Sequence, residues 1–146
     1  MTPTEAERIG RAWLAAGGGW RPGMLADVHD EIPPLRVVRA PGAALGGTAG
    51  LGMTETGDVA GLSPDCWPDP RDAATVGCML AAVRERWGDP WAYSNMGGGS
   101  PEIGVWHVHI TRRNYDTGTS HPVSRRGPTE PEALLSALAT APKGAS

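Results

Sequence analysis

Six tryptophans are the main aromatic residues of a chain that contains no phenylalanine. The 146 residues include 21 glycines and 14 prolines, a composition that approaches that of disordered segments. Because a buried aromatic ring removes about 150–250 Å² of surface from water, the tryptophans can compensate for the scarcity of leucine, isoleucine and valine. We therefore predict that residues 1–146 form a single compact domain with a small core rich in tryptophan.

The charge and the cysteine content of the chain exclude several classes of protein. A formal charge of −3 argues against nucleic acid as a direct partner, because sequence-independent affinity for phosphates comes from clustered cations. Two cysteines, Cys66 and Cys78, are too few for a disulfide scaffold. No apolar stretch approaches the ~20 residues of a membrane helix, and the first residues do not resemble a signal peptide. We expect a cytoplasmic protein without a membrane partner.

Three segments carry the start and stop signals of helices. The first covers residues 3–16, which follow a potential capping box and precede three glycines. The second covers residues 70–87, with Asp69 as its expected cap and apolar residues at helical spacing. The third covers residues 130–141, with Thr129 as its cap. These segments predict three amphipathic helices.

Strands are expected between the second and the third helix. Residues 103–112 alternate between an apolar face, which should meet the helices, and a face with two histidines. Residues 91–96 and 119–124 are weaker candidates on either side, and Pro122 restricts the second of these to an edge. Residues 35–39 form a further candidate strand upstream.

The order of these elements predicts an α+β fold, in which an antiparallel sheet of three or more strands is covered by two to three helices. Residues 1–67 combine the first helix with a glycine-rich loop region, and residues 68–142 form a helix–strand–strand–helix unit. Residues 40–61 are compatible with either a long loop or a short hairpin. An uncovered sheet edge could pair with a second copy of the chain, so we keep a homodimer as an alternative.

One pentapeptide, Asp116-Thr117-Gly118-Thr119-Ser120, matches the active-site turn of aspartic proteases. Such a site needs two aspartates that share a proton, with apolar strands leading into the turn. The flanking residues here are polar and basic instead. Because Asp-Thr-Gly is also ordinary turn chemistry, we interpret the segment as the turn of a hairpin.

Two histidines, His107 and His109, lie on the same face of a predicted strand. This spacing occurs in metal sites, but a site needs a third and a fourth ligand, and nothing in the sequence fixes one nearby. His109 and Thr111 also resemble one arm of a two-histidine phosphoesterase, which needs a second arm that the chain lacks. We assign no cofactor and keep a metal site at these histidines as an alternative.

The predicted partner-binding surface combines tryptophan and arginine side chains with a glycine-rich loop. Tryptophan and arginine are enriched in the hot spots of interfaces, and loops with few side chains can adapt to a partner. In the competing interpretation both tryptophans fill the core. The candidate residues are Trp20, Arg21, Trp67, Gly46, Gly47, Gly50 and Gly52.

Three segments resemble sequences that recur in small uncharacterised phage and prophage proteins. They are residues 68–88 (PDPRDAATVGCMLAAVRERWG), residues 20–25 (WRPGML) and residues 127–138 (GPTEPEALLSAL). Over about residues 68–141 the chain is similar to the phage alpha-beta-alpha sandwich domain. The resemblance implies a layered fold and an origin in a mobile element, and it brings no catalytic residues.

The leading hypothesis is a small, acidic, phage-derived protein that binds a host or phage protein and has no enzymatic activity. Inhibition of a bacterial defence complex, such as a CRISPR effector, is one form of this function. A metal-dependent or phosphodiester hydrolase that uses His107 and His109 is an alternative from another class. A structural accessory protein of the phage particle is a third interpretation.

Overall fold

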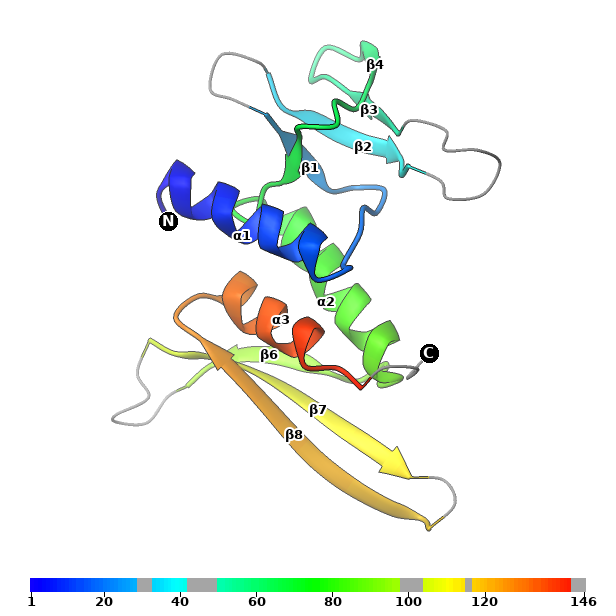
Figure 1. The fold of residues 1–146 in the computed structure, drawn as a ribbon, viewed down its shortest axis with the longest axis vertical. Helices are drawn as coiled ribbons and strands as arrows, with labels where there is room; N and C mark the ends of the chain where they lie inside the picture. Colours follow the sequence, from blue (N-terminus) through cyan, green and yellow to red (C-terminus); the bar gives the residue numbers. More distant parts are fainter. Residues whose placement is uncertain (29–32, 42–49, 98–103, 115–116, 143–146) are drawn as a thin grey trace. The chain divides into compact units, whose positions relative to one another are not determined.

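The computed structural model describes residues 1–28, 33–41, 50–97, 104–114 and 117–142. These residues form an α+β structure in which two antiparallel sheets pack against helices (Figure 1). The chain divides into two compact units, Met1–Cys78 and Met79–Ser146, and the division falls inside helix α2 (Ala73–Trp87). The prediction of one domain over residues 1–146 stays a prediction. None of the helices in the described part of the chain could cross a membrane.

The first unit contains one helix and a five-stranded antiparallel sheet with the order β4-β3-β2-β1-β5. Its elements are α1 (Pro3–Ala15), β1 (Leu25–Asp27), β2 (Leu35–Arg39), β3 (Leu51–Met53), β4 (Val59–Gly61) and β5 (Trp67–Pro68). The expected helix and the strand over residues 35–39 are confirmed. Residues 40–61 contain the hairpin of β3 and β4, while residues 42–49 lie outside the described part.

Helix α1 begins where its sequence predicts and packs against β5. Thr2 and Glu5 form the expected capping box, with the Glu5 backbone donating to Thr2 and the Thr2 backbone donating to the Glu5 carboxylate. Ile9 and Trp13 are fully buried beneath the helix. A side chain at Gly10 would overlap the carbonyl oxygen of Pro68, so this glycine allows the helix to approach β5 closely.

The prediction that α2 begins at residue 70 with Asp69 as its cap is wrong. The helix begins at Ala73, and Asp72 is the cap, since its carboxylate accepts from the Thr75 backbone at 2.8 Å. Asp69 instead accepts from the backbone and side chain of Arg71, which holds residues 69–72 in a turn. Two aspartates three residues apart could both cap a helix, and the packing selects the second.

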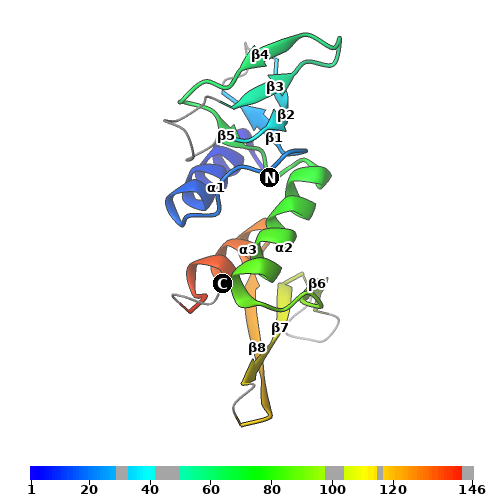
Figure 2. The same cartoon turned by 90° about the vertical axis from the view of Figure 1, so that its right-hand side faces the viewer.

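The second unit contains the later residues of α2, a three-stranded antiparallel sheet and a third helix (Figure 2). The strands, in the order β6-β7-β8, are β6 (Tyr93–Met96), β7 (Trp106–Asn114) and β8 (Thr119–Gly127), and the helix is α3 (Glu130–Ala139). Pro122 lies on the edge strand β8, as predicted. The β7–β8 hairpin extends beyond the end of α3 in both views (Figures 1 and 2).

The turn between β7 and β8 contains the Thr117-Gly118 part of the protease-like pentapeptide. Gly118 has φ +67°, a backbone conformation that favours glycine, and Thr117 and Thr119 share a hydrogen bond between their hydroxyl groups. Asp116 lies outside the described residues. The antiparallel pairing of the two strands confirms that this segment joins a hairpin.

Candidate functional site

The sheet of the second unit has one face against α3 and one face that the helix does not cover. Val108 and Ile110 of β7 are buried on the α3 side, as predicted from the alternation in the sequence. Strand residues that pair directly share a face, so the register places the histidines of β7 on the other side. We call this side the open face, and it consists of Tyr93, Asn95, His107, His109, Thr111, Pro122, Ser124 and Arg126.

A stack of three rings crosses the open face from β6 to β7. The Tyr93 and His109 rings lie 4.8 Å apart between centroids at an angle of 24°, and the His109 and His107 rings lie 5.9 Å apart at 18°. The side chain of Tyr93 keeps 51% of its surface exposed, while the two histidines are half-buried. A flat aromatic surface that is still accessible at one end therefore lies across two strands.

Asn95 fixes the orientation of the His109 ring. The ring nitrogen Nε2 of His109 donates to Oδ1 of Asn95 at 2.9 Å, because an amide oxygen can only accept. This hydrogen bond occupies the Nε2 side of the ring in the structure. Among the described residues there is also no group of three histidine, cysteine, aspartate or glutamate side chains that could hold a metal. The structure brings the two histidines together as stacked rings instead.

The strands that carry the histidines are strongly basic. Together β7 and β8 contain four arginines and three histidines, and no aspartate or glutamate. On the open face, Arg126 pairs with His107 in the register and is exposed. Arg125 lies on the other face, where its Nε donates to the Thr140 hydroxyl at the end of α3. The open face thus combines aromatic rings with one exposed arginine, Arg126, on the edge strand β8.

The exposed apolar side chains of the second unit lie next to the open face in the sequence. Trp91 is 79% exposed and Met96 is 53% exposed, and both flank Tyr93 within six residues. The interior side of the same segment is well packed, since Ala92 is fully buried. Trp91 directly precedes β6, whereas Met96 pairs with Trp106 and therefore lies on the α3 side of the sheet.

The residues predicted for partner binding all belong to the first unit and do not form one exposed surface there. Trp67 is buried and Trp20 and Arg21 are half-buried. Gly50 and Gly52 are buried beside leucine side chains of the sheet, and Gly46 and Gly47 lie outside the described residues. The burial of Trp67 agrees with the competing interpretation, in which this tryptophan fills the core.

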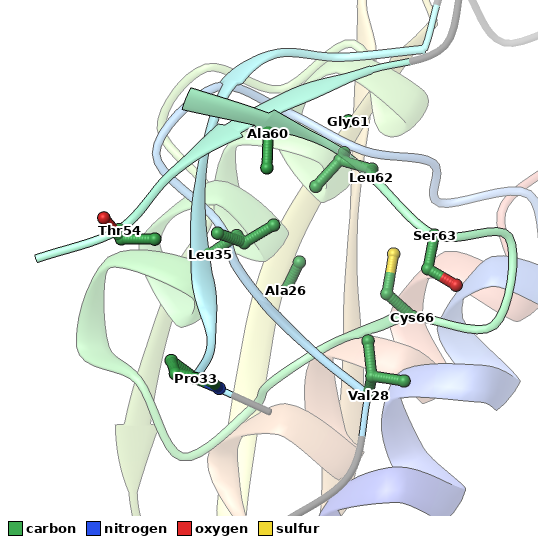
Figure 3. Close-up of a pocket in the computed structure, with 10 residues that line it drawn as sticks. All are labelled: Ala26, Val28, Pro33, Leu35, Thr54, Ala60, Gly61, Leu62, Ser63 and Cys66. Atoms are coloured by element: carbon green, nitrogen blue, oxygen red, sulfur yellow. The ribbon is translucent and has the colours of Figure 1, made fainter. Parts of the chain in front are cut away.

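The first unit also contains an apolar cavity of about 350 Å³ between β1, β2 and β4 (Figure 3). Ala26, Leu35 and Ala60 surround its centre, with Thr54 on one side and Cys66 on the opposite side (Figure 3). Burial raises the pKa of the Cys66 thiol, which therefore stays protonated at neutral pH. The Thr54 hydroxyl is already hydrogen-bonded within its own turn. Apart from Thr54, Ser63 and Cys66, the described residues that line the cavity are apolar residues and one glycine.

Comparison with known proteins adds no relative. No family model matches the chain, and neither the curated proteins nor the solved structures contain a match.

The sequence predicted the histidine side of the open face but not its other members. The alternation in β7 placed His107 and His109 together, which the ring stack confirms. Tyr93 and Arg126 join them only through the pairing of β6 and β8 with β7. The sequence did indicate strands at residues 91–96 and 119–124, on either side of the strand with the histidines. It did not give the register that aligns their residues with His107 and His109.

Proposed function

We propose that this protein acts by binding a macromolecular partner through the open face and the exposed residue Trp91, which precedes β6. The observation that carries the proposal is the ring stack of Tyr93, His109 and His107 on a sheet face that α3 does not cover. Tryptophan, tyrosine and arginine are the residue types that contribute most to interfaces, and all three occur here.

The origin of the partner is proposed from the resemblance alone. Similarity of residues 68–88 and 127–138 to phage and prophage sequences supports a partner from the phage or its bacterial host. A defence complex of the host is one such partner, because a phage protein that occupies a working surface of the complex would inhibit it.

The experiment that tests this function is capture from a bacterial lysate with the tagged chain, with both bound protein and bound nucleic acid measured. The test variant is Trp91→Ser/Tyr93→Ser, which removes two exposed aromatic side chains from the second unit. The matched control is Val38→Ser/Val59→Ser, which removes two exposed apolar side chains from the first unit. A second variant, Trp20→Ala, tests the surface that the sequence predicted.

We expect a partner in stoichiometric amount that the wild type and the Val38→Ser/Val59→Ser control retain and the Trp91→Ser/Tyr93→Ser variant loses. Circular dichroism confirms that each variant is folded. If the Trp91→Ser/Tyr93→Ser variant captures the same material as the wild type, or if the wild type captures none, the proposal is wrong. If only the Trp20→Ala variant fails to capture the partner, the binding site lies in the first unit, as the sequence predicted.

A further inference from the structure

We infer that the partner of the open face is a single-stranded nucleic acid, an inference that rests on the proposed function and names its partner. Two features of this face carry it: an accessible ring stack and the exposed Arg126 on the edge strand β8. Proteins bind single strands by stacking unpaired bases on aromatic side chains while cations contact the phosphates. The open face supplies both within one three-stranded sheet.

The ring stack provides the surface for a base. Tyr93 stacks on His109 with an angle of only 24° between the rings, and half of the Tyr93 side chain stays exposed. Tyr93 lies on β6, at the edge of the sheet, so a base can reach it without displacing a neighbouring strand. The hydrogen bond between His109 and Asn95 holds the second ring in place, which reduces the entropy lost on binding.

The cation of the open face, Arg126, lies on β8, across the sheet from Tyr93 on β6. His107 pairs with Arg126, so the cation is a direct neighbour of the last ring of the stack. Neither β7 nor β8 carries an acidic residue that would repel a phosphate. The overall charge of −3 does not oppose this arrangement, because salt screens charges over about 10 Å and a phosphate responds to the cations nearest to it.

The combination favours a single strand over a duplex and over an acidic protein. In a duplex the faces of the bases are stacked on one another, so an exposed ring on a flat sheet finds no base to bind. An acidic protein surface would attract Arg126, but it does not present the flat bases that stack on Tyr93 and the histidines. An unpaired strand engages both parts of the open face.

The test measures binding of fluorescein-labelled oligonucleotides of about 10 nucleotides by fluorescence anisotropy, a length in the range that small single-strand sites cover. Single-stranded DNA and RNA are compared with a DNA duplex of the same length. The full chain is used as wild type and as Tyr93→Leu, Tyr93→Phe and Arg126→Gln. Arg39→Gln is the matched control, because Arg39 is an exposed arginine on a strand of the first unit.

We expect the single strand to bind more tightly than the duplex. Tyr93→Leu should weaken binding roughly tenfold, since stacking of one base on a ring contributes about that factor or more, and Tyr93→Phe should bind like the wild type. Arg126→Gln should reduce the slope of log affinity against log salt by about 0.7, the value for one lost phosphate contact to a single strand. Arg39→Gln should change neither quantity.

Three results would overturn the inference: no binding of single strands, equal binding of the duplex, or equal affinity of Tyr93→Leu and wild type. The proposed function fails separately. If the Trp91→Ser/Tyr93→Ser variant loses a captured protein while oligonucleotides do not bind the wild type, the open face is a binding surface for a protein and only the inference about nucleic acid is wrong.

Discussion

The two units of this protein use their arginines in different ways. In the first unit, Arg36 bonds the carboxylate of Asp72 through both terminal nitrogens, and Arg71 bonds Asp69 and Asp27. In the second unit, four arginines lie on a hairpin whose strands contain no acidic residue. The first arrangement pairs arginines with carboxylates, whereas the second places four arginines on strands without a carboxylate, where Arg125 bonds the Thr140 hydroxyl instead. The formal charge of −3 averages over this difference and conceals it.

The largest effect on stability is expected where α1 approaches β5 closely in the first unit. In Gly10→Ala the new Cβ would overlap the Pro68 carbonyl and the Trp67 side chain, so α1 must move away from β5. We expect the free energy of unfolding to fall by about 3 kcal/mol, the range for overpacking of a core. Denaturant titration measures the total loss.

Hydrogen exchange then locates that loss. Faster exchange in α1 and β5, with unchanged protection in β7, would show that the damage stays within the first unit. Equal loss of protection in β7 would contradict the division into two units at Cys78 and Met79.

Asp72 carries the second effect, because it combines a helix cap with an ion pair. Its carboxylate accepts from the Thr75 backbone and hydroxyl as well as from Arg36. Asp72→Ala removes all of these bonds and should cost about 2 kcal/mol of stability. Asp72→Asn keeps a capping oxygen and loses the charge, so it should cost about half as much. Chemical denaturation of both variants separates the cap from the ion pair. Equal costs would show that a neutral capping oxygen adds nothing and that the charge of Asp72 accounts for the whole effect.

The same residue gives the first unit a dependence on pH. Burial raises the pKa of Asp72, but hydrogen bonds from Arg36 and Thr75 lower it by more, so its pKa lies below the ordinary value. A lowered pKa contributes stability that is present above the unfolded value near ~4 and is lost as the pH falls through the folded value. Denaturation at acid pH should therefore show a decline that is smaller in Asp72→Asn.

Much of the fold could be predicted because its signals are local. The capping residues Thr2 and Thr129 located α1 and α3, and alternation identified β7 and its buried face. The start of α2 could not be located in this way. Asp69 and Asp72 are both suitable caps, and the choice depends on Arg36, which is 36 residues away along the chain.

The parts that could not be predicted depend on pairing between distant segments. Strands β1 and β5 have three and two residues, too few for a periodic pattern. The roles of the helical glycines also depend on contacts between distant segments. Among the described residues nothing lies within 4 Å of a Cβ added at Gly77, whereas a Cβ added at Gly10 would overlap the carbonyl oxygen of Pro68. For the open face, the sequence contains its residues but not the register that aligns them.

Two buried tryptophans, one in each unit, give a third and smaller effect. The indole nitrogen of Trp87 donates to the Ala137 carbonyl at 2.8 Å, whereas no described residue accepts from that of Trp67. Both Trp87→Phe and Trp67→Phe remove similar volume, and only the first leaves a carbonyl without its donor. We expect Trp87→Phe to lower the free energy of unfolding by about 1 kcal/mol more than Trp67→Phe does. Denaturant titration measures this difference, and equal values would mean that the Trp87 hydrogen bond contributes nothing.

The smallest expected effect is an increase in stability, at Gly77 of α2, which we compare with Gly10 of α1. Gly77 is exposed in α2 and a Cβ there meets none of the described residues, so Gly77→Ala removes only the conformational freedom that glycine has in the unfolded chain. We expect an increase of about 0.5–1 kcal/mol in the free energy of unfolding. Gly10→Ala and Gly77→Ala make the same chemical change in a helix, so their opposite signs would separate packing from helix propensity. A loss of stability in Gly77→Ala would show instead that α2 needs this glycine where it passes from one unit to the other.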